Sequence, residues 1–177
     1  MSNINTKEYW DEFHQKESSI SAVTMYILFN LIPWDSSVID IGCGHSNLVI
    51  RLNREKNCKI YGIDISEFAI KALAKHKIEC DVMNAENLDG LNREADIVVI
   101  SHILEHITND EGLIRNALRM AKRFVLIAVP NNCMPPEECP EHERMYNKES
   151  LTKLLKKYST QIDDHSSGRH LILKAYV

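Results

Sequence analysis

The 177-residue sequence has no long apolar run and no excess of positive charge. Its most apolar stretches fall well short of the roughly 18 residues that a membrane-spanning helix needs. The first residues, 1–5, are polar and lead into a charged segment, which is not the pattern of a secretory signal. The net charge of −4 gives no basic surface of the kind that nucleic-acid-binding proteins use. We therefore expect neither a membrane nor a nucleic acid as partner.

Paired cysteines are also missing. The five cysteines form no CxxC pair, so reduced thiols in a cytoplasmic protein are expected rather than a disulfide framework. Cys133, Cys139 and His142 lie near one another in the chain, with His165 and His170 downstream. Their spacings are loose and prolines interrupt them, whereas structural zinc sites usually use tight ligand pairs. A proline-rich loop with free thiols is favoured over a metal site, and no metal is expected.

Short apolar runs alternate with amphipathic segments along the chain. Strands are predicted at 38–41, 59–65, 79–83, 96–101 and 124–129. Helices are predicted at 8–15, 21–31, 47–52, 67–74 and 110–122. The fourth and fifth strands are apolar on both faces, as buried strands of a parallel sheet are. This alternation predicts an α/β fold with a doubly wound sheet and helices on both faces.

The pattern changes after Pro130. A loop runs to about residue 146, and a helix is predicted near 148–158. The last apolar strand, at 171–177, is expected to pair antiparallel with a short strand around 160–162. We expect one domain over 1–177. It would consist of an N-terminal helical cap (1–35), a ligand-binding core (36–132) and a C-terminal segment that contacts substrate (133–177).

Glycines follow the first predicted strand, where an open α/β sheet binds its ligand. Gly42 and Gly44 allow a tight turn and a close backbone approach, because neither has a Cβ. The amides at the start of the next helix can then face an anionic group. The third glycine of the dinucleotide pattern G-x-G-x-x-G is replaced by Asn47, which counts against NAD. Asp40, just before the turn, is suited to contact an ammonium group.

Three further strand ends carry polar residues. Asp64 ends the second strand about twenty residues after the glycines, where an acidic side chain can accept both hydroxyls of a ribose. Asn84, Ala85 and Glu86 follow the third strand, within reach of an adenine edge. The segment 101–106 follows the fourth strand. Each feature alone is weak, since an Asp at a strand end is often only a helix cap, but together they indicate a nucleoside-containing ligand.

Four segments carry a family resemblance: 38–44, 61–66, 84–88 and 99–107. They resemble the class I S-adenosylmethionine-dependent methyltransferases, in particular the small Rossmann-like members of the Methyltransf_11 and UbiE type. The resemblance is close over about 36–132. It implies a seven-stranded sheet of order 3-2-1-4-5-7-6 with strand seven antiparallel. It also implies S-adenosylmethionine as cofactor and S-adenosylhomocysteine as product.

The resemblance and the strand ends together give the expected cofactor residues. These are Asp40, Gly42, Gly44, Asp64, Ile65, Asn84, Ala85, Glu86, Ser101 and His102. Two of the positions depart from the family pattern. Ser46 stands where many members have a third glycine, and Asn84 stands where many have Asp. Both replacements are conservative for binding, so neither predicts an inactive site.

Three histidines are candidate general bases, because an unperturbed imidazole titrates near neutrality. His102 follows the fourth strand, and a role as a wall of the cofactor pocket is slightly favoured over a role as base. His106 has capping or packing as its alternative. The family often shows His-x-Arg-x-aromatic after strand five, which makes His142, Arg144 and Tyr146 expected substrate contacts and His142 a possible base. A loop histidine that is hydrogen-bonded to the backbone is the equally weighted alternative for His142.

The acceptor is the least determined part of the prediction. Tyr9 and Trp10 of the first helix are candidate substrate contacts, with packing on the sheet as the alternative. An NPPY-type segment is absent after strand four, and a small or sugar-like acceptor is favoured, with O-methylation slightly ahead of N-methylation. The end of a larger glycan is also possible. Two other hypotheses stay open: an NAD-type oxidoreductase and a non-catalytic adenosylmethionine-binding or partner-binding module. The protein is expected to be a monomer or a homodimer.

Overall fold

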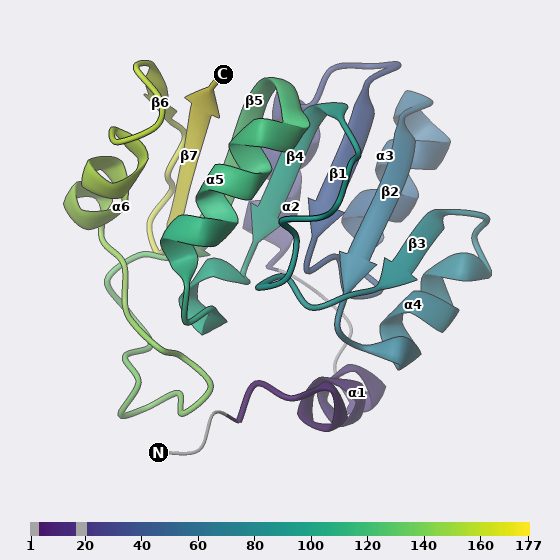
Figure 1. Ribbon diagram of the computed structural model, residues 1–177, viewed down its shortest axis with the longest axis horizontal. Coiled ribbons are helices and arrows are strands. Elements are labelled where there is room, and N and C mark those ends of the chain that lie inside the picture. The colour runs from purple at the N-terminus through teal and green to yellow at the C-terminus, as the bar shows by residue number, and fades with distance from the viewer. Residues whose placement is uncertain (1–3, 17–20) are drawn as a thin grey trace.

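The computed structural model describes residues 4–16 and 21–177. It contains a seven-stranded sheet with helices packed against it (Figure 1). Residues 1–3 and 17–20 of the expected N-terminal cap lie outside this range, and the division of the chain into 1–35, 36–132 and 133–177 stays a prediction. The strand order is β3-β2-β1-β4-β5-β7-β6, as the resemblance implied. The strands are β1 (Ser37–Ile41), β2 (Lys59–Asp64), β3 (Glu79–Val82), β4 (Ala95–Ser101), β5 (Ala121–Pro130), β6 (Ile162–Asp164) and β7 (His170–Tyr176).

Strands β1 to β5 pair in parallel, and β7 pairs antiparallel with both β5 and β6. Because β1 has β2 on one side and β4 on the other, the strand order reverses there. The carboxyl ends of β1 and β4 therefore form the switch point at which open α/β sheets bind ligands. The interiors of β1, β2, β4 and β5 are buried, as the apolar runs predicted, whereas β3 has no buried residue.

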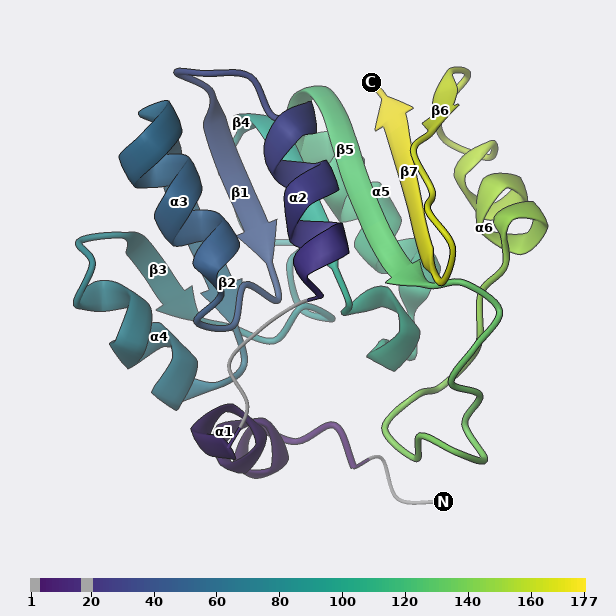
Figure 2. The ribbon, with the colours of Figure 1, turned by 180° about the vertical axis from the view of Figure 1, so that it is seen from behind.

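Helices cover both faces of the sheet (Figures 1 and 2). Helices α2 (Ala22–Leu31), α3 (Asn47–Lys56) and α4 (Glu67–Ala74) pack on one face. Helices α5 (Asp110–Met120) and α6 (Lys148–Leu155) pack on the other. Helix α5 ends two residues before its predicted end, because Ala121 is extended and pairs with Ala95 of β4. Burying a leucine or isoleucine contributes about 1.5–3 kcal/mol, so these two apolar layers hold the sheet in place.

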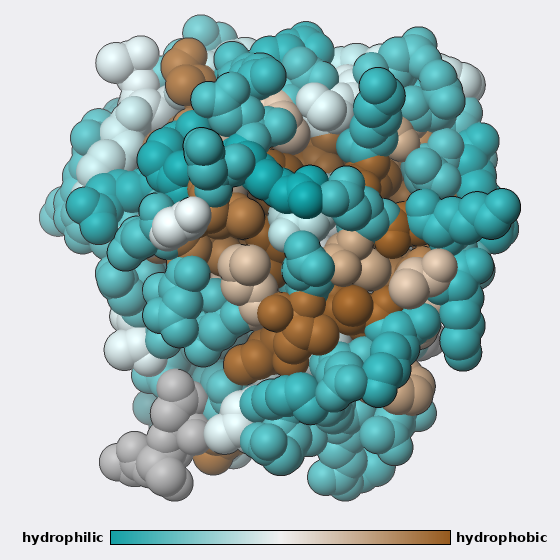
Figure 3. Space-filling view, turned by 45° about the vertical axis from the view of Figure 1, so that its right-hand side comes forward, coloured by the Kyte–Doolittle hydropathy of each residue, from teal (hydrophilic) through white to brown (hydrophobic). Residues whose placement is uncertain are grey.

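The connection between β3 and β4 contains no helix. Residues 83–94 form turns, with Leu88 fully buried and Met83 and Leu91 packed against the same core. Figure 3 looks onto the side that carries β2, β3 and α4, and apolar residues gather in the middle of that face between polar ones. The loop 83–94 therefore covers part of one face of the sheet, where helices connect the other parallel strands.

Helix α1 (Lys7–Lys16) lies beyond the carboxyl ends of the strands rather than on the sheet (Figure 1). It has no buried residue. Asp11 Oδ1 accepts hydrogen bonds from Ser66 Oγ (2.6 Å) and from the Phe68 amide (3.0 Å), which joins α1 to the start of α4. Helix α1 is thus held over the strand ends by polar contacts. No helix of the described residues is long and apolar enough to span a membrane.

Candidate cofactor and acceptor site

A cavity of about 440 Å³ lies at the carboxyl ends of the central strands. Its wall comes from α1, from the loops after β1, β2 and β4, and from the loop 131–147 after β5. It therefore brings together segments from both ends of the chain. The predicted site residues that line it are Trp10, Gly42, Gly44, Asp64, Ile65, Ser101, His102, His106 and His142.

The glycine turn needs glycine at both predicted positions. Gly42 and Gly44 have φ of +72° and +51°, which residues with a Cβ rarely adopt. A Cβ on Gly42 would lie 2.7 Å from Ile103 Cδ1, and one on Gly44 would lie 2.9 Å from His14 Cε1. The amides of Gly42 and Cys43 both donate to the Ile63 carbonyl (2.7 and 3.0 Å), which folds the turn over the end of β2.

Asp64 holds the glycine turn in place. Its Oδ2 accepts the Gly44 amide at 2.7 Å, and its Oδ1 accepts the Ser66 amide at 2.8 Å. Burial raises the pKa of this carboxyl, against the opposing effect of the Ser66 amide. Each carboxylate oxygen can accept a second hydrogen bond, so the predicted contact to ribose hydroxyls remains open to it. The contact between Asp64 and the turn has no signal in the sequence beyond the position of Asp64 at a strand end.

Asp40 lies beneath the turn and outside the cavity lining. It is 3% exposed, and its Oδ1 has no hydrogen-bond partner among the described residues. Burial, together with the nearby charge of Asp64, raises its pKa to about 8. An isolated buried carboxylate is costly, whereas a cation beside it would favour the charged form.

The polar groups around the turn fit adenosylmethionine. Besides Asp40 Oδ1, three buried atoms of cavity-lining residues have no partner in the described part of the chain, namely Ser101 Oγ, His45 Nδ1 and Glu105 Oε2. The first two belong to residues that follow or end β1 and β4, at the glycine-turn side. Unsatisfied buried groups are rare in native proteins. The ammonium, carboxylate and ribose hydroxyls of the cofactor offer a donor or an acceptor to each of those at the glycine-turn side. The residues of this end of the cavity are therefore compatible with the expected cofactor.

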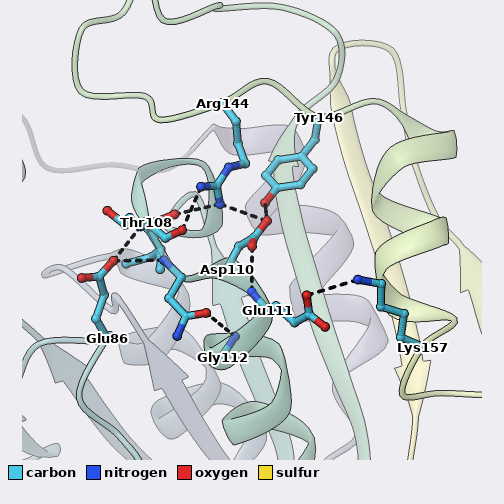
Figure 4. A network of polar contacts seen from close by, with 10 residues as sticks. Glu86, Thr108, Asp110, Glu111, Gly112, Arg144, Tyr146 and Lys157 are labelled. Carbon is cyan, nitrogen blue, oxygen red and sulfur yellow. Dashed lines mark hydrogen bonds and ion pairs between the residues drawn. The ribbon is translucent and has the colours of Figure 1, made fainter. Parts of the chain in front are cut away.

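Three predicted adenine-contacting residues do not line the cavity. Asn84 Oδ1 accepts the Glu86 amide at 2.9 Å, and Ala85 is buried. Glu86 Oε1 accepts the amides of Thr108 (2.6 Å) and Asn109 (3.3 Å), as Figure 4 shows. Glu86 thus ties the loop after β3 to the start of α5. The adenine contact of this segment stays a prediction.

His102 is held on both sides of its ring. Nδ1 lies 3.4 Å from Glu105 Oε1, and Nε2 lies 3.4 Å from Thr24 Oγ1. The residue has φ of +54°, and its amide donates to the Ala128 carbonyl at 2.8 Å. Thr24 also bonds to His170 Nδ1 at 3.0 Å. Because both ring nitrogens have partners, this geometry favours a pocket wall over a general base.

The 3-10 helix η1 (Leu104–His106) brings Glu105 and His106 to His142. All three are buried, with exposed fractions of 2%, 8% and 6%. The rings of His106 and His142 lie 4.8 Å apart, and Trp10 contacts His106 edge-on at 4.9 Å. Burial lowers the pKa of His106. Burial also opposes ionisation of Glu105, but the hydrogen bond with His102 and the charge of His106 outweigh it and lower that pKa.

Arg144 and Tyr146 do not line the cavity. Both side chains point toward Asp110 instead (Figure 4). Arg144 donates to the carbonyls of Ile107 (2.8 Å) and Thr108 (2.9 Å), and it pairs with Asp110 at 2.9 Å. Tyr146 donates to Asp110 Oδ2 at 2.6 Å, and burial raises the pKa of its hydroxyl above the usual range. Both residues attach the loop 131–147 to the start of α5. Tyr9 is likewise absent from the lining, so these three substrate contacts stay predictions.

All five cysteines are free. The described residues contain two groups of three side chains whose ligating atoms lie within 4.8 Å of one another. The groups are Glu105, His106 and His142, and Cys139, Glu141 and His142. Cys133, His165 and His170 belong to neither. Glu105 and Glu141 are the two residues of these groups that were not included in a candidate site predicted from the sequence. Only the position of Glu105 next to His106 in the sequence could have indicated its role.

Comparison with known proteins identifies the family. The family model Methyltransf_31, described as "Methyltransferase domain", matches residues 34–171. Mouse EEF1A lysine methyltransferase 2 is 25% identical over 152 residues, and ajmaline N-methyltransferase of Rauvolfia serpentina is 26% identical over 126 residues. These alignments cover 71% and 63% of this chain, and 60% and 43% of the relatives. The chain thus spans about half the length of the curated relatives it matches.

The fold is shared with solved structures. Magnesium protoporphyrin IX methyltransferase from Synechocystis PCC 6803, solved with bound S-adenosylhomocysteine, superimposes with a TM-score of 0.73. The match covers 96% of this chain and 97% of that one, at 16% sequence identity. Together with the family model and the strand order 3-2-1-4-5-7-6, these findings show that the chain belongs to the class I S-adenosylmethionine-dependent methyltransferases.

Proposed function

We propose that this protein transfers the methyl group of S-adenosylmethionine to a hydroxyl group of a small or sugar-like acceptor. One observation carries the proposal. A single cavity joins the glycine turn and Asp64 at one end to His106, His142 and Trp10 at the other. A cofactor bound over the turn and an acceptor beside the histidines would therefore share one space.

The two ends of the cavity have separate tasks. When bound, adenosylmethionine would supply an electrophilic methyl group, and its sulfur would be the leaving group. The glycine turn and Asp64 would orient the cofactor, and Asp40 would favour its ammonium group. His106 and His142 line the other end, where an imidazole nitrogen can take the proton that the acceptor hydroxyl loses. Trp10 and the loop 131–147 would limit the access of water.

Two other hypotheses are kept for the same cavity. N-methylation is one, because the curated relatives include a lysine methyltransferase and an N-methyltransferase by name. Glu105 Oε2 has no partner among residues 4–16 and 21–177, and it could hold an acceptor amine. A non-catalytic adenosylmethionine-binding or partner-binding module is the other. Methyl transfer to a hydroxyl is favoured because the acceptor end combines two imidazoles with one carboxylate. This set suits proton removal from a hydroxyl better than binding of an acceptor ammonium group.

The proposed acceptor class, oligomeric state and cellular location are those expected from the sequence. A small-molecule or glycan-type acceptor rather than a nucleic acid remains the proposed partner, in a monomer or homodimer. The five free thiols support the proposed reducing, cytoplasmic location.

Calorimetric titration with adenosylmethionine and adenosylhomocysteine tests the cofactor assignment. The wild type should bind both ligands. Asp64→Ala should weaken binding at least tenfold, because it releases the Gly44 amide and removes the predicted ribose contact. Asp163→Ala, on β6 and away from the cavity, is the matched control and should bind like the wild type. Equal binding by wild type and Asp64→Ala would refute the cofactor assignment.

A methyl-release screen then tests the acceptor. Formation of adenosylhomocysteine is measured with sugars, nucleotide sugars, phenols and amines. Turnover with a hydroxyl acceptor supports the proposal. Turnover with amines alone would favour N-methylation, and cofactor binding without turnover on any class would favour the non-catalytic module.

A further inference from the structure

We propose that Glu105, His106 and His142 form a binding site for a divalent transition-metal cation at the acceptor end of the cavity. The inference rests on the proposed function, since it assigns the cation the task of holding the acceptor hydroxyl. It departs from the sequence-based expectation that no metal is bound. Three independent features of the cluster support it: the orientation of its histidines, the state of its carboxylate, and its ligand types.

Both histidines are fixed in the tautomer that a metal ligand needs. His106 Nδ1 lies 3.0 Å from the Glu141 carbonyl, and His142 Nδ1 lies 2.7 Å from the Met134 carbonyl. A carbonyl oxygen can only accept, so each Nδ1 must carry the hydrogen. Each neutral ring then keeps a lone pair on Nε2, to which the described residues make no hydrogen bond. A metal-ligating histidine typically has this second bond to a carbonyl or carboxylate.

Only one of the two carboxylate oxygens of Glu105 has a polar partner among the described residues. Its Oε1 lies 3.4 Å from His102 Nδ1, whereas its Oε2 is buried and has no partner within the described residues. The side chain is 2% exposed, and its backbone carbonyl accepts the Glu143 amide at 2.8 Å, which fixes the residue against the loop 131–147. A buried carboxylate oxygen is costly unless it is paired or binds a metal. His102 thus orients the carboxylate, and Oε2 is left for a cation.

The ligand types select the cation. Two imidazoles and one carboxylate suit Zn²⁺, Mn²⁺, Co²⁺ or Fe²⁺, whereas Mg²⁺ and Ca²⁺ prefer oxygen ligands throughout. A ligating atom from each residue lies within 4.8 Å of the others. Ligands at about 2.1 Å from a tetrahedral ion lie roughly 3.4 Å apart, so side-chain rotations can close the site. Because all three residues line the cavity, the remaining coordination positions face the acceptor.

The second ligating group, Cys139, Glu141 and His142, is the weaker candidate. Cys139 and Glu141 are only half-buried, and the backbone carbonyl of Glu141 already accepts from His106 Nδ1 and Asn5 Nδ2. Cys139 is also absent from the cavity lining.

A cation in front of Glu105 would serve the methyl transfer directly. It would bind the acceptor hydroxyl oxygen and make its proton easier to lose. The proton leaves to solvent, because His106 and His142 act as ligands rather than as bases when the cation is bound, and a lone pair of that oxygen forms the new C–O bond. The C–S bond of the cofactor breaks, and its electron pair stays on sulfur. The site therefore selects acceptors that offer one or two adjacent hydroxyl oxygens, such as a vicinal diol or a catechol.

Cobalt binding tests the site without an activity assay. Protein treated with a chelator and then dialysed is titrated with Co²⁺, and the visible absorption bands of the bound ion are followed, with thermal shifts for Zn²⁺, Mn²⁺ and Mg²⁺. The wild type should bind Co²⁺ and be stabilised by the transition metals more than by Mg²⁺. Glu105→Gln and His142→Gln should each weaken Co²⁺ binding at least tenfold. His76→Gln, whose ring bonds to Arg54 far from the cavity, is the matched control and should bind Co²⁺ like the wild type.

Adenosylmethionine titration of the same variants separates the possible failures. Retained cofactor binding by Glu105→Gln shows that the variant is folded, so its loss of Co²⁺ would reflect the lost ligand. A wild type that binds adenosylmethionine but neither Co²⁺ nor Zn²⁺ would overturn the metal site and leave the proposed methyl transfer standing. Unchanged Co²⁺ binding in both ligand variants would overturn it as well. Failure of the wild type to bind adenosylmethionine would instead refute the proposed function.

Discussion

The two ends of the cavity are built from different kinds of contact. At the cofactor end, the glycine turn directly follows β1 and Asp64 ends β2, and backbone amides make most of the contacts. At the acceptor end, α1 and the residues before it, η1 and the loop 131–147 meet although they are up to 136 residues apart, as in the bond from Asn5 to the Glu141 carbonyl. The cofactor end is thus positioned by the sheet, and the acceptor end by contacts between loops.

This difference indicates that acceptor specificity is determined at the acceptor end of the cavity. Residues that directly follow parallel strands are placed by the sheet register, which loop changes leave intact. The position of the loop 131–147 at the acceptor end depends on side-chain contacts, chiefly those that Arg144 and Tyr146 make with Asp110. Changes in those residues can reshape the acceptor end without altering cofactor binding. The predictions below test this separation.

Gly42→Ala should have the largest effect. A Cβ there requires a disfavoured positive φ, which costs about 1–2 kcal/mol, and it meets Ile103 Cδ1 at 2.7 Å, which costs about as much again. We expect a loss of about 3 kcal/mol in the free energy of unfolding by urea and at least a tenfold loss of adenosylmethionine affinity. Gly90→Ala is the control, because nothing lies within 4 Å of its Cβ. Normal cofactor binding by Gly42→Ala would show that the turn does not hold the cofactor.

Asp110→Ala should loosen the acceptor end alone. It removes the ion-pair partner of Arg144 and leaves the buried Tyr146 hydroxyl without an acceptor, which together cost about 2 kcal/mol. The free energy of unfolding should fall by about that amount, while calorimetric affinity for adenosylmethionine changes less than twofold. Tyr146→Phe, which loses only the hydroxyl, should lose about 1 kcal/mol. If Asp110→Ala loses as much cofactor affinity as Gly42→Ala, the two ends of the cavity are coupled.

The cofactor end was largely predictable from the sequence, because local patterns determine it. An apolar run followed by Gly42 and Gly44 indicates both the strand and the turn, and the position of Asp64 follows from the next run. The strand order came from the family resemblance and is confirmed.

The acceptor end could not be predicted in the same way. Glu105 meets His142 only after the chain has folded, and no spacing in the sequence signals that meeting. The internal ion pairing of Arg144 likewise depends on where the loop 131–147 crosses α5. Long-range contacts between irregular segments leave no periodicity, so local patterns carry little information about them.

Asp40→Asn tests the electrostatics beneath the glycine turn. Folding raises the pKa of Asp40 from 3.8 to about 8, so the folded state keeps a proton that the unfolded state releases. The stability of the wild type should therefore fall as pH rises from about 4 to 8, by up to about 1.4 kcal/mol per pH unit, and Asn removes this slope. Urea unfolding at pH 5 and pH 8 should show the advantage of Asp40→Asn growing with pH. Saturating adenosylmethionine should flatten the wild-type slope, because its ammonium group favours the carboxylate.

Trp10→Ala should have the smallest effect on stability and act at the acceptor end. Helix α1 has no buried residue, so the free energy of unfolding should change by less than about 1 kcal/mol. Trp10 lines the cavity and contacts His106 at 4.9 Å, so its loss should raise KM for the acceptor several-fold and leave adenosylmethionine affinity nearly unchanged. Tyr9→Ala, beside it but outside the lining, is the control for changes in α1 itself. If both variants raise KM equally, α1 acts on the acceptor as a cover whose position matters, and Trp10 makes no specific contact. Because the cofactor end is positioned by the sheet, neither Trp10→Ala nor Tyr9→Ala should change the affinity for adenosylmethionine.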